Sequence, residues 1–265
     1  MKPFTKQLIL FDINNLDPDA KLFLLATGLM NNIQIAQAIN TFVLELKENN
    51  LWSTFLCIYP LVGGTSTTHK YNLKDPRDLD AAYRLVFSGG YTHNSNGITG
   101  NGLNSNTNTN LNANVTAINS TALSVYSRTT GANGGTDIGL SVGAASPRLN
   151  LMIHYTNNNT YFDVNNAYLG TAVALATTAT GLYISSRTDS NVIKLYRRGA
   201  TASSQADAST TQNTTPIYFG VLAGGGYTSR NTCFYSIGSG LTDTQASQLN
   251  EAVQNLQTAL GRNAY

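Results

Sequence analysis

The chain has 265 residues, of which 42% are hydrophobic and only 11% are charged. An ordinary soluble domain carries about 25% charged residues, so Asn, Ser, Thr and Gly must keep this chain soluble. Disorder usually accompanies high net charge and few aromatic residues, whereas this chain has a net charge of +2 with 14 Tyr and 9 Phe. The composition therefore excludes a disordered chain. It also argues against nucleic-acid binding, because no Lys/Arg cluster could follow a phosphate backbone.

Targeting signals and cysteines give further expectations. The apolar run Leu8 to Phe11 is shorter than the core of a secretory signal. The longest apolar stretch, 22–30, is interrupted by Thr27 and Gly28 and is too short to span a bilayer. We expect synthesis in a cytoplasm and no membrane insertion. Cys57 and Cys233 are too few for a disulfide framework, so we interpret them as small buried side chains, with pairing left open.

The first 58 residues are predicted to be an N-terminal arm followed by a helical segment. Asp17-Pro18-Asp19 is a typical helix start, and that helix should end near Gly28. A second helix should begin at Asn31 or Asn32 and end at Asn49-Asn50. One apolar stripe marks its buried face: Ile35, Ile39, Phe42, Val43 and Leu46. We assign 1–58 to anchoring and assembly.

Within the arm, four consecutive apolar residues form a candidate docking strand. They are Leu8, Ile9, Leu10 and Phe11. An exposed apolar strand of this kind could add to the sheet edge of a partner.

Residues 59–241 are predicted to form a β-sandwich. Short alternating segments bounded by Gly, Asn, Ser or Pro recur without intervening helices. The clearest are 123–126, 138–142, 149–155, 182–185 and 217–221. About nine or ten such strands favour a mainly β, antiparallel two-sheet jelly-roll fold. The Asn/Gly/Thr/Ser-rich stretches 91–119 and 200–215 are interpreted as surface loops or irregular edge strands.

Residues 242–265 are predicted to form a C-terminal helix that packs on the sandwich. Thr242-Asp243-Thr244-Gln245 is a capping box. Ala246, Leu249, Val253, Leu256 and Leu260 then mark one apolar face, and Gly261-Arg262 closes the helix.

Catalytic and metal-binding patterns are scarce. Glycoside hydrolysis needs two acidic residues that flank the sugar bond, but the only glutamates, Glu45, Glu48 and Glu251, all fall on predicted helices. An Asp pair is left open, and we expect no enzyme activity and no cofactor. The three histidines, His69, His93 and His154, have no metal-ligand spacing. A shallow calcium site is left open for Asp137, Asp163 or Asp189.

Tyrosines in Asn-rich loops are the candidate contact residues. Tyr91, Tyr168 and Tyr227 lie in or beside predicted loops, and Arg230 and Asn231 follow the last of these. Tyrosine rings stack on sugars, and they also pack against neighbouring subunits, so glycan contact and partner contact both stay open.

The late strand segments resemble those of laminin-G-like and concanavalin A-like lectin/glucanase domains. The segments are 181–187, 192–199, 216–220, 233–238 and 241–246. The resemblance covers about residues 120 to 260 and implies the fold, since enzymes, lectins and inert spacers all use it.

A second set of segments resembles virion proteins of tailed bacteriophages that carry such a domain. The segments are 38–47, 51–52, 58–64, 72–76, 237–242 and 260–262. The resemblance implies a head-fibre, capsid-decorating or tail-surface role. It also implies a homo-oligomer that contacts other virion proteins and adheres to host-surface carbohydrate, made in the bacterial cytoplasm and located on the virion surface. The alternative is a lectin-like module with no assembly role.

Overall fold

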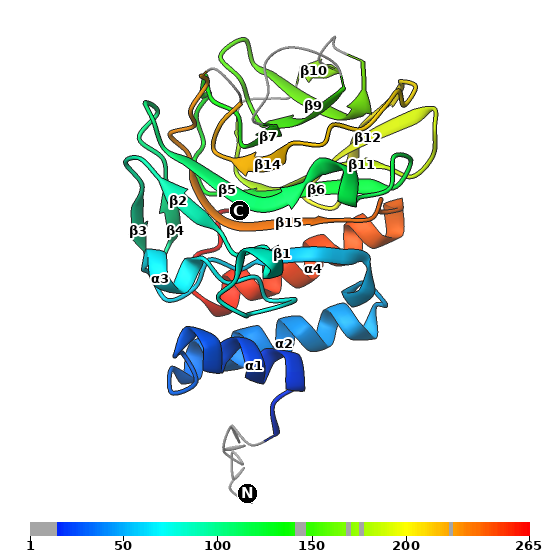
Figure 1. Cartoon of the computed structure of the whole chain (residues 1–265). Coiled ribbons are helices and arrows are strands. Elements are labelled where there is room, and N and C mark those ends of the chain that lie inside the picture. Colours follow the sequence, from blue (N-terminus) through cyan, green and yellow to red (C-terminus); the bar gives the residue numbers. More distant parts are fainter. Residues whose placement is uncertain (1–14, 141–146, 168–170, 175–177, 223–224) are drawn as a thin grey trace, which may run out of the picture.

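The computed structural model describes residues 15–140, 147–167, 171–174, 178–222 and 225–265. They form three layers: a layer of helices, a first sheet packed on it, and a second sheet beyond (Figure 1). The prediction of a mainly β, two-sheet antiparallel sandwich with helices at both ends is confirmed. The described residues contain fifteen strands, more than expected.

The eight-stranded sheet faces the helices on one side and the other sheet on its opposite side. Its order is β13 (Ala200–Ala206), β12 (Val192–Arg197), β11 (Gly181–Arg187), β6 (Thr121–Ser127), β15 (Asn231–Gly238), β4 (Gly97–Thr99) and β3 (Thr92–Asn94), and β1 (Phe55–Tyr59) also pairs with β15. Every residue of β6 is buried. Ala122 and Tyr126 belong to the core on the helix side, whereas Leu123 and Val125 belong to the core between the sheets, as strand alternation requires.

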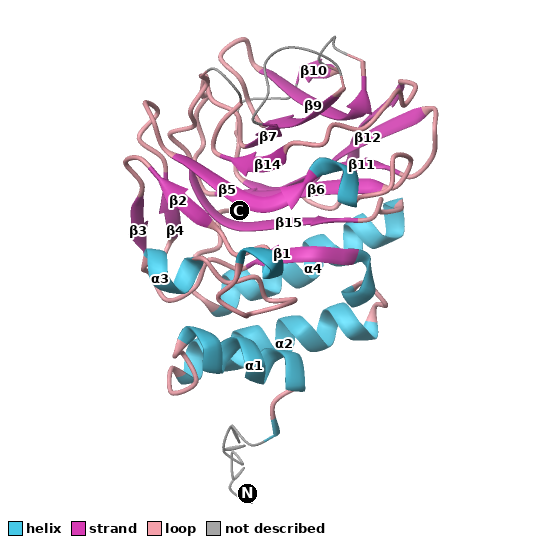
Figure 2. Ribbon diagram, viewed as in Figure 1, coloured by secondary structure: helices cyan, strands magenta, loops and turns pink. Residues whose placement is uncertain are grey.

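The seven-stranded sheet closes the sandwich (Figure 2). Its order is β10 (Ala172–Ala174), β9 (Asn159–Asn166), β8 (Arg148–Met152), β7 (Ile138–Leu140), β14 (Pro216–Phe219), β5 (Asn106–Asn112) and β2 (Val86–Ser88). Phe219 of this sheet stacks on Tyr235 of the other at a ring-centroid distance of 4.0 Å. Neighbouring strands in both sheets run antiparallel, so the connections between them gather at the two ends of the sandwich.

The helix layer consists of α1 (Pro18–Thr27), α2 (Ile33–Glu48) and α4 (Asp243–Ala259). The helix-capping residues predicted from the sequence cap the helix N-termini in the structure. Asp17 accepts a hydrogen bond from the amide of Asp19, Asn32 accepts one from Ile35, and the Thr242–Gln245 capping box forms. Phe42 of α2 meets Phe234 of β15 edge-on at 5.8 Å, so the helices are anchored on the eight-stranded sheet.

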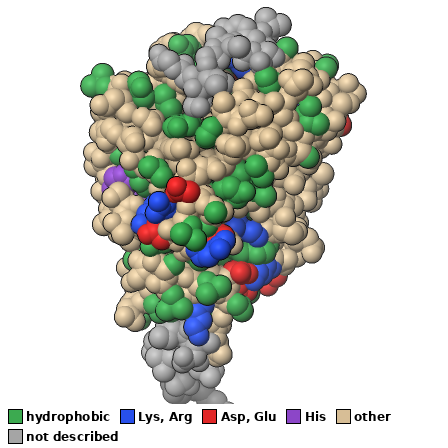
Figure 3. Space-filling model, viewed as in Figure 1, with side chains coloured by type: hydrophobic (Ala, Val, Ile, Leu, Met, Phe, Trp, Pro, Cys, Tyr) green, Lys and Arg blue, Asp and Glu red, His purple; other side chains and the backbone are tan. Residues whose placement is uncertain are grey.

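The remaining helices are short: η2 (Trp52–Thr54), α3 (Ser66–His69), η3 (Asp80–Ala82) and η4 (Ala113–Val115). Acidic and basic side chains of the segment 70–84 pair with one another, as Arg84 does with Asp78 at 2.9 Å and with Asp80 at 2.8 Å. On the face shown in Figure 3, charged side chains gather in the lower half of the molecule.

Two local predictions were wrong. Residues 55–58 belong to strand β1 and not to the helical segment, so the assigned boundary at residue 58 falls inside a strand. Residues 106–112 form β5, which is an inner strand between β14 and β2 and not a loop or an edge. By contrast, residues 200–206 form the edge strand β13. The sequence had left a surface loop and an irregular edge strand open for this stretch. Cys57 and Cys233 are buried, as predicted, and both are free thiols, which answers the question of pairing that the sequence left open.

Candidate functional site

Connections from both sheets meet at one end of the sandwich. They are the β6–β7 loop (128–137), the β8–β9 turn (153–158) and the β14–β15 loop (220–230, described except for 223–224). The amide of Thr136 donates to the carbonyl of Gly226 at 2.8 Å, and that of Asn133 donates to the carbonyl of His154 at 3.0 Å. We call the surface formed by these three segments the rim.

Glycine allows the backbones of the rim to approach closely. A Cβ atom on Gly135 would lie 2.3 Å from backbone atoms of Thr228, closer than real side chains allow. The β6–β7 and β14–β15 loops can therefore pack directly against each other, and they form an isolated parallel bridge between Thr136 and Tyr227.

A buried ion pair lies beneath the rim. Arg230 and Asp137 are both 0% exposed, and Arg230 Nε lies 3.1 Å from Asp137 Oδ1. Arg230 also donates to the carbonyls of Gly131 at 3.0 Å and His154 at 2.9 Å, and to the carbonyl of Ile153. One guanidinium therefore joins the β6–β7 loop to the β8–β9 turn.

The carboxylate of the pair is held by its own hydrogen bonds. The Ile153 amide donates to Asp137 Oδ2 at 2.8 Å, and the Thr228 hydroxyl donates to Oδ1 at 3.3 Å. Burial raises the pKa of Asp137, while Arg230 and these hydrogen bonds oppose the rise. Since each partner compensates the other in a dry interior, neither charge can be removed alone without a large cost.

Above the ion pair is an open depression of about 400 Å³. Uncharged residues line it: Gly102, Ala132, Asn133, Gly134, Gly226, Tyr227 and Ser229. The side chain of Asn133 donates to the Ser229 hydroxyl at 2.5 Å. The Thr136 hydroxyl is buried and has no hydrogen-bond partner within the described part of the chain. It lies about 4.0 Å from the position that a Cβ atom on Gly226 would take. The depression thus combines one aromatic ring, neutral hydrogen-bonding groups and unobstructed backbone.

The structure separates the residues that were predicted to make contacts. Tyr227 lines the rim depression, but Arg230 lies buried beneath it, where it pairs with Asp137 and donates to loop carbonyls. Asn231 donates through its side chain to the Ile98 carbonyl at 3.2 Å and to the Thr99 hydroxyl at 2.9 Å, so it holds β15 against β4.

The other predicted contacts lie elsewhere or outside the described residues. Tyr91 packs edge-on against Phe87 at 5.8 Å, and its hydroxyl donates to the Phe219 carbonyl at 3.3 Å. Burial raises the pKa of this hydroxyl to about 12, so Tyr91 serves packing. Tyr168 and the arm residues Leu8, Ile9, Leu10 and Phe11 lie outside the described residues.

Sequence reasoning missed Asn133 and Ser229, and it considered Asp137 only as a calcium ligand. The available signal was a pair of glycine-containing runs in the sequence, 133–135 and 224–226. Of the other calcium candidates, Asp163 is buried in β9, while Asp189 accepts hydrogen bonds from the amides of Asn191 and Val192. No group of three or more His, Cys, Asp or Glu side chains able to hold a metal occurs among the described residues.

Two histidines that are distant in the sequence meet away from the rim. His69 Nδ1 lies 3.0 Å from His93 Nδ1, and His69 Nε2 accepts from the Gly64 amide. Since Nε2 is an acceptor, Nδ1 of the neutral ring carries the proton and donates to His93. Burial, with His93 and Arg262 nearby, lowers the pKa of His69 to about 3. The pair is therefore neutral near pH 7 and serves as a structural contact.

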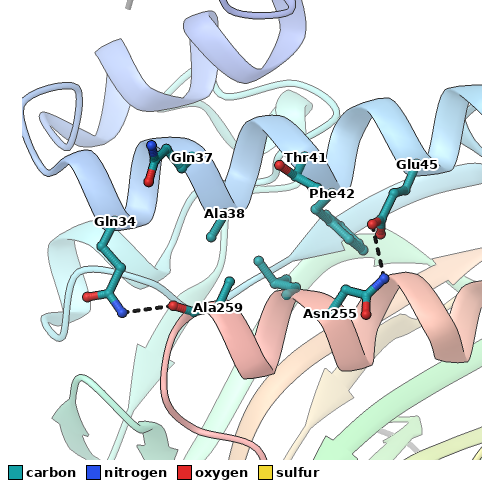
Figure 4. A pocket seen from close by; sticks show the side chains of 9 residues that line it. Gln34, Gln37, Ala38, Thr41, Phe42, Glu45, Asn255 and Ala259 are labelled. Carbon is teal, nitrogen blue, oxygen red and sulfur yellow. Dashed lines mark hydrogen bonds between the residues drawn. The ribbon is translucent and has the colours of Figure 1, made fainter. Parts of the chain in front are cut away.

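A narrow groove of about 140 Å³ runs between α2 and α4 (Figure 4). Gln34 donates to the Ala259 carbonyl at 2.8 Å, and Asn255 donates to Glu45 at 3.0 Å. Burial raises the pKa of Glu45, and Glu251 and Glu48 raise it further. These contacts join the two helices across the groove, so we interpret it as a seam of the helix layer.

Comparison with known proteins identifies the fold. No protein-family model and no curated protein sequence matches the chain. Among solved structures, it is similar to domain 4 of AbnA, a GH43 extracellular arabinanase from Geobacillus stearothermophilus, in complex with arabinotriose. The TM-score is 0.54 at 14% identity, over 74% of this chain and 98% of that one.

Botulinum neurotoxin binding domains are also similar. The receptor-binding domain of the C/D mosaic serotype gives a TM-score of 0.54 at 13% identity, over 76% of this chain and 51% of that one. A structure of botulinum neurotoxin type C gives 0.53 at 11% identity, over 77% and 53%. The chain thus spans about half the length of the toxin domains. At these identities the likeness shows the β-sandwich fold alone, and the virion resemblance rests on the sequence segments.

We predict that the rim ion pair is strongly coupled. Replacing Asp137 by Asn should lower the free energy of unfolding by about 3–5 kcal/mol, because a buried cation is left uncompensated. Replacing Arg230 by Met should also lower the free energy of unfolding, because the buried Asp137 carboxylate is left without its cation. The double variant should lose clearly less stability than the sum of the two single losses. Urea unfolding of the four proteins measures the coupling, and additive losses would show that the two side chains act independently.

Proposed function

We propose that the chain is a carbohydrate-binding β-sandwich protein without enzymatic activity, and that the rim depression is its binding site. The observation that carries the proposal is the set of groups gathered there: the Tyr227 ring beside Asn133, Ser229 and two glycines, with no charge in the lining. Tyrosine offers a rigid, amphipathic surface, and Asn and Ser adapt their hydrogen bonds to hydroxyl groups. The buried pair beneath preorganises the loops, as a binding site requires.

The solved structures support a carbohydrate ligand by analogy. The arabinanase domain was determined in complex with arabinotriose. For botulinum neurotoxin type C, cell entry is described as dependent on interaction with two ganglioside molecules. A non-enzymatic role is supported by the glutamates, because Glu45 and Glu48 lie on α2 and Glu251 on α4, away from the rim.

Binding to a glycan array tests this proposal, and Tyr227 provides the decisive variant. We expect Tyr227→Ala to weaken binding about tenfold, equivalent to about 1.4 kcal/mol, because the stacking surface is lost. Tyr227→Phe should retain most of the affinity, since the ring remains. Tyr71→Ala, in the segment after α3, is the matched control and should bind like the wild type. Equal affinities for wild type and Tyr227→Ala would place the binding site elsewhere.

We also propose that the chain is a structural protein of a bacteriophage virion, located on the head-fibre, capsid or tail surface and assembled through its helical end. The observation that favours assembly is the outer face of α1. Leu22 and Leu25 are 56% and 58% exposed, and Ile33 at the start of α2 is 59% exposed. Other residues of α1, Phe23 and Leu24, are buried. Large apolar side chains exposed together on one helix are normally covered, and we propose that a second copy of the chain covers them.

Light scattering on the full-length protein tests the assembly proposal. We expect an oligomer that dissociates when Leu22 and Leu25 are both replaced by Ser, because the apolar contact is removed. Val115→Ser, an exposed apolar position (47%) on η4 in the sandwich, is the control and should leave the oligomer intact. A monomeric wild-type protein would remove self-assembly from the account.

A further inference from the structure

Two further tyrosines lie beside the rim depression, Tyr155 in the β8–β9 turn and Tyr161 near the start of β9. The rings of Tyr155 and Tyr161 meet edge-on with centroids 5.8 Å apart, and the Asn157 side chain donates to the Tyr161 hydroxyl at 2.8 Å. Both rings are partly exposed, and residues 156–158 between them are exposed. The edge-to-face contact and the hydrogen bond fix the orientation of the rings without burying them.

This turn is continuous with the depression. The amide of Asn133 donates to the His154 carbonyl at 3.0 Å, while the side chain of Asn133 donates to Ser229 at 2.5 Å. Gly134 lines the depression. A Cβ atom added to Gly134 would lie 3.7 Å from Thr156 Cγ2 of the β8–β9 turn. Asn133 therefore connects the two tyrosine-bearing segments, and no bulky side chain projects from Gly134 between them.

The charge of the two surfaces restricts the ligand. The lining of the depression is uncharged, and the turn from Tyr155 to Asn159 is likewise uncharged. Arg230, which lies beneath the depression, is buried and paired with Asp137. An acidic sugar would lose hydration here without gaining a cationic partner, whereas neutral hydroxyl groups find the Asn, Ser and Thr side chains.

We propose that Tyr155, Asn157 and Tyr161 form a second sugar subsite, so that the ligand is a neutral oligosaccharide spanning the β8–β9 turn and the rim depression. This inference rests on the proposed carbohydrate binding at the depression. One sugar unit stacks at Tyr227, and a following unit contacts the Tyr155–Tyr161 pair. Affinity then depends on ligand length, because two subsites on one rigid surface bind a linked ligand better than a single sugar.

Calorimetric titration with defined probes tests the subsite. The probes are arabinotriose, maltotriose and cellotriose, the monosaccharides arabinose and glucose, and the acidic trisaccharide sialyllactose. We expect the wild type to bind at least one neutral trisaccharide ten or more times as tightly as its monosaccharide, and tighter than sialyllactose. Tyr161→Ala should remove most of the trisaccharide advantage and leave monosaccharide affinity unchanged, whereas Tyr227→Ala should weaken both. Tyr161→Phe keeps the ring and should retain the advantage.

The outcomes separate the two proposals. Trisaccharide binding that depends on Tyr227 but not on Tyr161 overturns the second subsite and leaves the rim depression as the binding site. Preference for sialyllactose overturns the neutral ligand class. Failure of the wild type to bind any probe or any array glycan overturns the proposed function and the subsite with it. Thermal unfolding of each variant confirms that loss of binding is not loss of fold.

Discussion

The buried ion pair between Asp137 and Arg230 is the constraint on which the rim depends. It lies where the β6–β7, β8–β9 and β14–β15 connections converge. Together, the two side chains form hydrogen bonds with residues of all three connections. Loops of Gly, Asn, Ser and Thr have little apolar surface with which to order themselves, and the conformational entropy of such segments is high. A charge pair with directed hydrogen bonds supplies the order that apolar packing cannot supply there, and Tyr227, Asn133 and Ser229 are held in place as a result.

The layered architecture separates the two ends of the molecule. The helices cover one face of the eight-stranded sheet, so both faces of that sheet are buried and the core is divided in two. The helical end exposes Leu22 and Leu25, whereas the rim exposes neutral polar groups and tyrosines. The proposed attachment surface and the proposed ligand-binding surface therefore share no residues. The part of the chain described here contains no helix long and apolar enough to cross a membrane.

Local signals in the sequence predict the helices well because helix ends are decided by near neighbours. Asp17, Asn32 and the Thr242–Gln245 box each act within three residues of their own position. Strand β5 was missed for the opposite reason. Its buried face is formed by Thr107 and Thr109 with Leu111, and Thr gives no clear apolar alternation. Whether such a strand is buried depends on partners that are distant in the sequence.

The candidate site was predictable only in part. Tyr227 was identified from its loop context, but Arg230 was taken for a surface group because charged side chains are normally exposed. Its partner Asp137 is far away in the sequence, and nothing local indicates that the two meet. Asn133 likewise becomes informative only when the β6–β7 and β14–β15 loops are placed together. The resemblance of the late strands to concanavalin A-like domains correctly indicated the sandwich, yet it could not indicate the site, since this fold serves many functions.

A crystal structure of the protein with its strongest array ligand tests the central claim most directly. The account predicts a sugar ring over Tyr227, hydrogen-bonded to Asn133 or Ser229, with the Asp137–Arg230 pair unchanged beneath it. A ligand bound instead in the groove between α2 and α4, or on a sheet face away from the rim, would contradict the account.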